Sequence, residues 1–305
     1  MNDKEIGYDE LLHLFSELIN CNDELLEEFA TKKSIETKAN GGEILLIDRV
    51  IMKFYISISH KLTSLKVLYE ANCFGGAESI LRSVLEAIAY MDFVLEADNE
   101  QRAKAFDLSH EIRKYNDFQY KVDNREQFRK TEIDEIEEYK SIMENDKEFQ
   151  SKLRDYLQHT KNRQNYSDKY GTRFYSYKKD IENFRELCKY LNNSQGKLIN
   201  YERVYTNIYK LFSREVHGVD FENLIYKPGN TISVKNVENL RQTSLVKLSQ
   251  HLLFYLMKVI CKYANIEFEE FLKITLNAYS IELLLKQPEI TKILVNSKKI
   301  SLKKY

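Results

Sequence analysis

Two oppositely charged side chains, Arg82 and Glu86, lie four residues apart in a segment with a helical pattern. Residues four apart share one face of a helix, so these two can form an ion pair, and Glu78 extends the row by one turn. Apolar residues surround the row closely, which predicts a seam between helices rather than a wholly solvated surface. There the pair either locks helices together or orients a ligand, and direct catalysis is the alternative.

A second polar pair, Ser213 and His217, is also spaced four apart, at the end of another expected helix. Gly218 suits the left-handed residue that ends a helix, so His217 would occupy the last turn. There it can interact with the helix dipole and hydrogen-bond Ser213, or it can act as a general base. A serine hydrolase is not expected, because no nucleophile elbow or oxyanion glycine motif accompanies the pair.

Basic and aromatic residues are interleaved between Thr160 and Lys179. Such a mixture suits single-stranded RNA, because cations meet phosphates while rings stack on bases. The candidate RNA-binding residues are Arg163, Lys169, Tyr170, Arg173 and Lys178. The alternative is a solvated loop whose aromatic side chains fill the core, which the abundance of tyrosine throughout the chain favours.

Composition disfavours several kinds of site. A formal net charge of −1 gives no overall attraction to nucleic acid or to an anionic membrane, so such binding needs local patches. The histidines are scattered and no phosphate-binding loop occurs, so neither a metal nor a cofactor is expected. Without a signal core or about 18 uninterrupted apolar residues, we expect a cytoplasmic protein without membrane contact. The four cysteines, each in an apolar helical context, are expected to be reduced core thiols: Cys21, Cys73, Cys188 and Cys261.

The elements that position these residues are expected to be helices. Only 2 prolines and 9 glycines punctuate the chain, which is too little turn chemistry for a many-stranded fold. Apolar residues recur at helical spacing over Leu11–Phe29 and again over Glu43–Glu70. The turn Phe74–Gly76 and a third helix over Ala77–Leu95 predict a long antiparallel helix hairpin at the centre of an all-α bundle.

Further helices and a densely charged, exposed hairpin at about 121–177 are expected in the rest of the chain. The expected helices are Glu100–Tyr120, Lys178–Leu191, Asn200–Val216, Val234–Ala264 and Phe268–Leu285. We therefore expect three parts: an N-terminal helix packed on the core in 1–40, the helical core in 41–265, and a C-terminal helical extension with a basic tail in 266–305.

Two stretches together resemble a known family. Ala77–Glu86 resembles a Leu-Arg-x-x-x-Glu helix, and Tyr205–Gly218 a Tyr-x-x-x-Ser-x-x-x-His segment, of a bacterial family catalogued as domain of unknown function 5677. The resemblance covers about Lys53–Tyr226 and places the family's polar positions on Arg82, Glu86, Ser213 and His217, with Arg214 adjacent. That family is similar to the HEPN superfamily (higher eukaryote and prokaryote nucleotide-binding), whose helical bundles often dimerise and in many members cleave RNA without a metal.

The resemblance implies an HEPN-like protein that binds or cleaves RNA, as a homo-oligomer or with a partner protein, in a bacterial toxin or anti-phage defence system. His217 would take a proton from a ribose 2′-hydroxyl while Arg82 or Arg214 stabilises the phosphorane-like transition state. HEPN nucleases typically space Arg and His by four to six residues, which Arg214 and His217 do not, whereas Arg154 and His159 form a second-choice pair that does. The alternative is an inert interaction module, or a sensor of a nucleotide or other phosphorylated ligand, with structural polar residues.

Overall fold

The computed structural model describes residues 6–159, 173–177, 181–193, 199–206, 225–226, 233–234, 239–287 and 290. The chain forms two compact units. Unit 1 comprises residues 1–89 and 195–305, and unit 2 comprises residues 90–194, so that the boundary falls inside a helix. The three-part division expected from the sequence stays a prediction.

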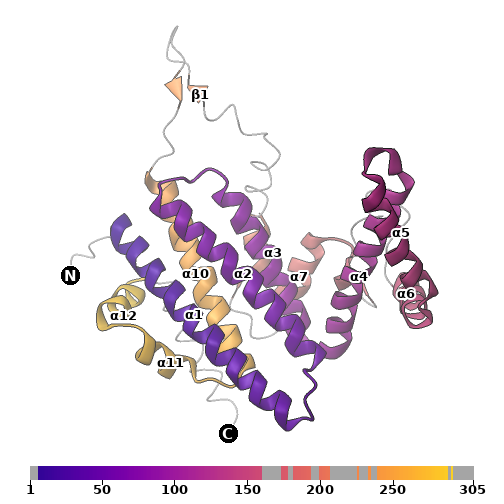
Figure 1. The fold of residues 1–305 in the computed structure, drawn as a ribbon. Helices are drawn as coiled ribbons and strands as arrows, with labels where there is room; N and C mark the ends of the chain where they lie inside the picture. Colours follow the sequence, from indigo (N-terminus) through magenta and orange to yellow (C-terminus); the bar gives the residue numbers. More distant parts are fainter. Residues whose placement is uncertain are drawn as a thin grey trace. The chain divides into compact units, whose positions relative to one another are not determined.

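Unit 1 is built around three long helices, α1 (Tyr8–Ala39), α2 (Leu46–Glu70) and α10 (Asn239–Tyr263). Helix α1 packs against both α2 and α10, and α10 also packs against α2 (Figure 1). Each buries the stripe of apolar residues that recurs every three to four positions. Among the described residues, one helix, Gln242–Tyr263, is long and apolar enough to span a membrane, yet 67% of its apolar 18-residue stretch is buried inside the protein. That burial is typical of a core helix.

Polar groups inside unit 1 fix how its long helices meet. The Asp48 carboxylate on α2 accepts from the Lys33 ammonium on α1 at 2.9 Å and from the Tyr263 hydroxyl on α10. Asn22 on α1 donates to the Ser59 hydroxyl on α2 at 3.0 Å. Because buried polar groups lose water, a register that broke these contacts would leave them unsatisfied.

The C-terminal part of unit 1 corrects one expectation. The single helix expected over Phe268–Leu285 is wrong, because the structure has α11 (Phe268–Thr275) and α12 (Ala278–Leu285). Between them, Asn277 is extended, and its side-chain oxygen accepts from the Ser280 amide at 2.8 Å. This cap begins a new helix in place of a continuation.

Helix α3 (Ala77–Glu96) follows α2 through the turn Phe74–Gly76 and crosses the boundary between the units. In the turn, Gly76 has a φ of +84°, which a residue without a Cβ adopts readily. Cys73 precedes this turn and is exposed, so its expected place in the core is wrong, whereas Cys21, Cys188 and Cys261 are buried. Cys73 lies between the end of α2 and the start of α3, so its apolar neighbours in the sequence do not place it on a buried helix face.

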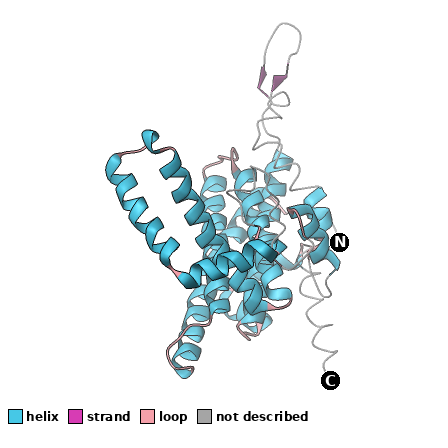
Figure 2. Cartoon of the chain, turned by 90° about the vertical axis from the view of Figure 1, so that its right-hand side faces the viewer, coloured by secondary structure: helices cyan, strands magenta, loops and turns pink. Residues whose placement is uncertain are grey.

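Unit 2 continues with the helices α4 (Asn99–Asp123), α5 (Lys130–Asn145) and α6 (Lys147–His159), which we call the arm; helices are cyan in Figure 2. Helix α5 packs against α4 and α6, and α6 also contacts α4. The other described elements of unit 2 after α3 are η1 (Arg125–Gln127), η3 (Phe174–Ser176) and α7 (Phe184–Asn193). The expected helix start at about Lys178 is wrong, because residues 181–183 are not helical and the Asn183 side chain accepts from the Glu186 amide at 3.1 Å.

The all-α prediction is confirmed. Besides helices, including the short α8 (Tyr201–Val204), the described chain contains β1 (Ile225–Tyr226) paired antiparallel with β2 (Ser233–Val234). Val234 thus lies in a strand and α10 begins at Asn239, so the helix start expected at Val234 is wrong. The HEPN-like arrangement of the central hairpin stays a prediction.

Candidate functional site

The Arg82–Glu86 pair forms on α3 as the spacing predicts. The Arg82 Nε lies 3.3 Å from the Glu86 Oε1, and the two side chains are 23% and 28% exposed. Leu81 and Val84 beside them are fully buried, and Glu78, one turn earlier in the same row, is 3% exposed. The pair therefore lies at the border between core and solvent, where an ion pair is strengthened by partial desolvation while a ligand can still reach it.

Lys61 on α2 joins this pair electrostatically. Burial lowers the pKa of the Lys61 ammonium, and the Glu86 carboxylate opposes that shift. Glu86 on α3 thus acts electrostatically on a lysine of the preceding helix. We call Lys61, Arg82 and Glu86 the α2–α3 seam; it contains two cations and one carboxylate.

Sequence reasoning missed Lys61, although a signal was present. From Arg49 to Tyr69 the chain contains no aspartate or glutamate. The solvent-facing positions of this stretch fall on one side of α2: Arg49, Lys53, Ser57, His60 and Ser64 are all exposed. A helix face with cations and hydroxyls but no carboxylate is what a polyanion would favour.

The proposed catalytic partners of the seam lie outside the described residues. These are Ser213, Arg214 and His217. The predicted composite of Arg82 with His217 therefore stays a prediction. For the second-choice pair, Arg154 is an exposed residue of α6, and the side chain of His159 is outside the described part.

Of the predicted RNA-binding residues, only Arg173 is described; Arg163, Lys169, Tyr170 and Lys178 lie outside the described residues. Arg173 donates a hydrogen bond to the backbone carbonyl of Glu182. The two rings that follow it, Phe174 and Tyr175, are 4% and 5% exposed and pack on Tyr90 with ring centroids 5.4 and 5.7 Å apart. These two rings fill the core of unit 2 and are not available to stack on bases.

No group of three or more histidine, cysteine, aspartate or glutamate side chains that could hold a metal ion occurs in the described part of the chain. The seam offers the Glu86 carboxylate beside two cations, and a second carboxylate, that of Glu78, lies one turn before Arg82 on α3.

A comparison with protein families matches residues 48–227 to a family described as a family of unknown function, DUF5677. The match covers more than half of the chain and includes the α2–α3 seam as well as Ser213 and His217. No curated protein and no solved structure matches the chain.

Proposed function

Because the chain belongs to the DUF5677 family of unknown function, we propose its function from the α2–α3 seam: it is an HEPN-like protein that binds RNA there and cleaves it without a metal. The observation that carries this proposal is the seam's position. Arg82 and Glu86 are about a quarter exposed, and a partly desolvated Lys61 lies near them. An anion can reach this site and would find two cations there.

The electrostatics of the seam favour a phosphate. Burial works against the charged form of Lys61, and Glu86 offsets this only in part, because its carboxylate is shared with Arg82. A phosphodiester beside Lys61 and Arg82 would supply the missing negative charge and accept charge-assisted hydrogen bonds. The exposed cations of α2 would extend the contact along the backbone of the RNA.

The cleavage step would use His217 as the base and an arginine as the electrophilic partner. His217 takes the proton of a ribose 2′-hydroxyl, and the 2′-oxygen attacks the adjacent phosphorus as the bond to the 5′-oxygen breaks. The departing 5′-oxygen takes a proton from water, so the products are a 2′,3′-cyclic phosphate and a 5′-hydroxyl. Arg82 or Arg214 stabilises the phosphorane-like transition state, and Glu86 orients Arg82. A toxin or anti-phage defence role, carried out as a dimer in the cytoplasm, is part of this proposal.

Binding is tested with fluorescently labelled single-stranded RNA and anisotropy. We expect Arg82→Ala and Lys61→Ala each to weaken binding about tenfold and to reduce its salt dependence, because each removes a phosphate contact. Arg125→Ala is the matched control, since it removes an exposed, ion-paired arginine of unit 2. If Arg125→Ala weakens RNA binding as much as the seam variants do, RNA affinity depends only on the overall charge of the protein. That result would refute binding at the seam.

Cleavage is tested separately with His217→Ala in the presence of EDTA. We expect the parent protein to cleave under these conditions and leave cyclic phosphate ends, and the variant to lose the activity by at least about a hundredfold. Unchanged turnover in the variant would exclude His217 as the base. A parent protein that binds RNA at the seam without cutting it would retain the binding half of the proposal and refute the nuclease half.

A further inference from the structure

Helix α5 in unit 2 has two faces of different character. Its inner face buries Ile133 and Ile136, which are 5% and 6% exposed. Farther around the helix, Tyr139 and Ile142 are 58% and 59% exposed. Exposed aromatic and aliphatic side chains that are neighbours on one helix face form a local apolar surface, whereas single ones are ordinary.

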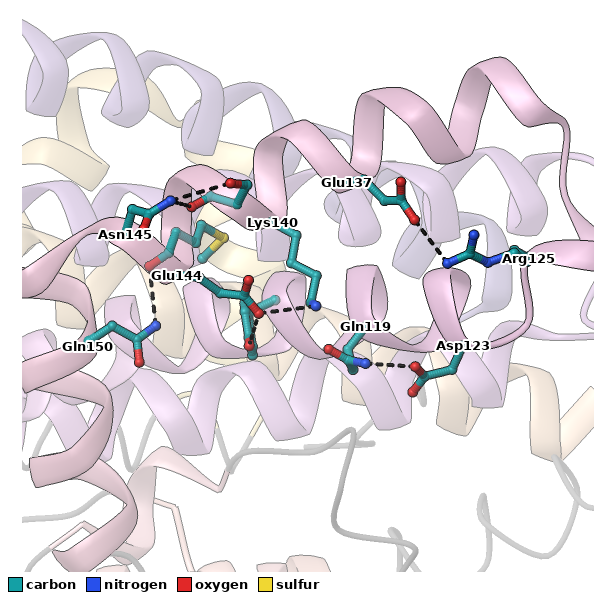
Figure 3. A network of polar contacts seen from close by, with 11 residues as sticks. Gln119, Asp123, Arg125, Glu137, Lys140, Glu144, Asn145 and Gln150 are labelled. Carbon is teal, nitrogen blue, oxygen red and sulfur yellow. Dashed lines mark hydrogen bonds and ion pairs between the residues drawn. The ribbon is translucent and has the colours of Figure 1, made fainter.

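Three cations beside α5 are already engaged in ion pairs. Arg125 pairs with Glu137 at 3.1 Å, and Lys140 pairs with Glu144 at 3.1 Å (Figure 3). Lys121 on α4 pairs with Glu132 at 2.9 Å. These contacts attach α5 to the elements beside it and neutralise its carboxylates at positions 132, 137 and 144.

Three exposed carboxylates of α5, those of Asp134, Glu135 and Glu138, are not neutralised in this way within the described part of the chain. Glu135 and Glu138 are exposed, and within the described part of the chain neither has an ion pair or a side-chain hydrogen bond. Residues 135, 138, 139 and 142 follow the i, i+3, i+4, i+7 spacing of one helix face. We call Glu135, Glu138, Tyr139 and Ile142 the α5 outer face.

We infer that the α5 outer face is a docking surface for a positively charged helical segment of another protein that carries apolar side chains of its own. Glu135 and Glu138 would pair with its lysines or arginines, and burial of Ile142 and the free side of the Tyr139 ring would add the hydrophobic term. Charge complementarity distinguishes a basic protein partner from the other candidates. RNA would be repelled by these carboxylates, and a second copy of this chain docked through the same face would oppose acid to acid.

The surface is held in place before a partner arrives. The Tyr139 ring stacks on Phe118, with centroids 6.3 Å apart, and Lys114 lies 5.6 Å from its centre. The Tyr115 hydroxyl donates to Glu144 at 3.0 Å, next to the Lys140 pair. A helix fixed on its inner side loses little further freedom on binding, which favours affinity.

The test uses the full chain and a labelled helical peptide of about 20 residues in which lysines surround one stripe of leucines. We expect the peptide to bind, the double variant Glu135→Lys with Glu138→Lys to weaken binding at least about tenfold, and Ile142→Ser to weaken it severalfold. The matched control is Glu111→Lys with Asp117→Lys, which makes the same change in charge at exposed positions of α4. A second probe has the same composition with the leucines scattered around the helix.

Three results would overturn the inference. Equal loss of binding in the α4 control would show attraction to overall charge alone, and equal binding of the scattered-leucine peptide would remove the apolar contribution. Ile142 is largely exposed, so Ile142→Ser is expected to keep the helical circular dichroism of the parent and to report on binding rather than folding. Competition by single-stranded RNA for the same face, absent from the α5 double variant, would assign the surface to nucleic acid and refute a protein partner. None of these outcomes depends on RNA binding at the α2–α3 seam.

Discussion

Two ion pairs, one inside unit 1 and one on the surface of unit 2, use charge in opposite ways. In unit 1, Asp48 is 5% exposed and binds Lys33 in the interior, so the ion pair decides how α1 and α2 meet. In the arm of unit 2, Arg125 and Glu137 are 63% and 44% exposed, so their pair has water as an alternative partner. The same two kinds of side chain therefore specify packing in one unit and shape the outer surface in the other. The α2–α3 seam lies between these extremes.

The largest effect should come from Asp48→Ala. The change leaves the Lys33 ammonium, whose side chain is 11% exposed, without its buried partner, and it also removes the acceptor of the Tyr263 hydroxyl. We expect a loss of about 3 kcal/mol in the free energy of unfolding, measured with urea and circular dichroism. Glu282→Ala, which breaks the exposed pair with Lys286 in the same unit, is the control and should cost less than about 0.5 kcal/mol. Similar losses in both variants would break the contrast between buried and exposed pairs.

Arg82→Ala should have an intermediate effect. Both partners of this ion pair are about a quarter exposed, so water can partly replace the lost contact, and we expect a destabilisation of about 1 kcal/mol. The same urea titration, combined with the RNA-binding assay, separates the two readings of the seam. A loss as large as that of Asp48→Ala with no change in RNA binding would identify a structural lock and an inert helical module.

Lys258 on α10 tests whether every charge inside unit 1 stabilises it. Burial lowers the pKa of Lys258 from 10.5 to about 8, while Glu269 opposes the shift. The folded state thus loses this proton at a lower pH than the unfolded state, so stability should rise between about pH 8 and pH 10.5. Because the side chain is half-exposed, we expect Lys258→Met to add only about 1 kcal/mol at pH 7 and to remove that rise. A pH profile unchanged by the substitution would contradict the assignment to Lys258.

The smallest effect should come from Arg125→Ala in the arm. The pair with Glu137 is mostly solvated, so we expect a change below about 0.5 kcal/mol in thermal or urea unfolding. A higher salt concentration should reduce this difference in stability between the variant and the parent further, because salt screens exposed ion pairs. A loss above about 1 kcal/mol would mean that the arm depends on its surface ion pairs for folding, as unit 1 depends on Asp48.

Local patterns predicted the elements better than their ends. The apolar stripe of α2 and the i, i+4 pair on α3 depend on helix periodicity alone, so both could be predicted from the sequence. The break before α12 was missed although Asn277 and Ser280 form a recognisable capping pattern. The start of α7 was missed for a similar reason at Asn183. A capping residue ends a helix without changing the spacing of the apolar residues on either side. The apolar spacing alone therefore does not reveal where one helix ends and the next begins.

The sequence by itself determined that the chain is helical and which face of each long helix is apolar, because both follow from spacing within a few residues. Only the tertiary structure decided which charges are buried. Asp48 meets Tyr263, 215 positions away, and the seam gained Lys61 from a different helix than its arginine and glutamate. Burial and pairing of this kind depend on residues that come together only when the helices pack, so no local pattern contains them.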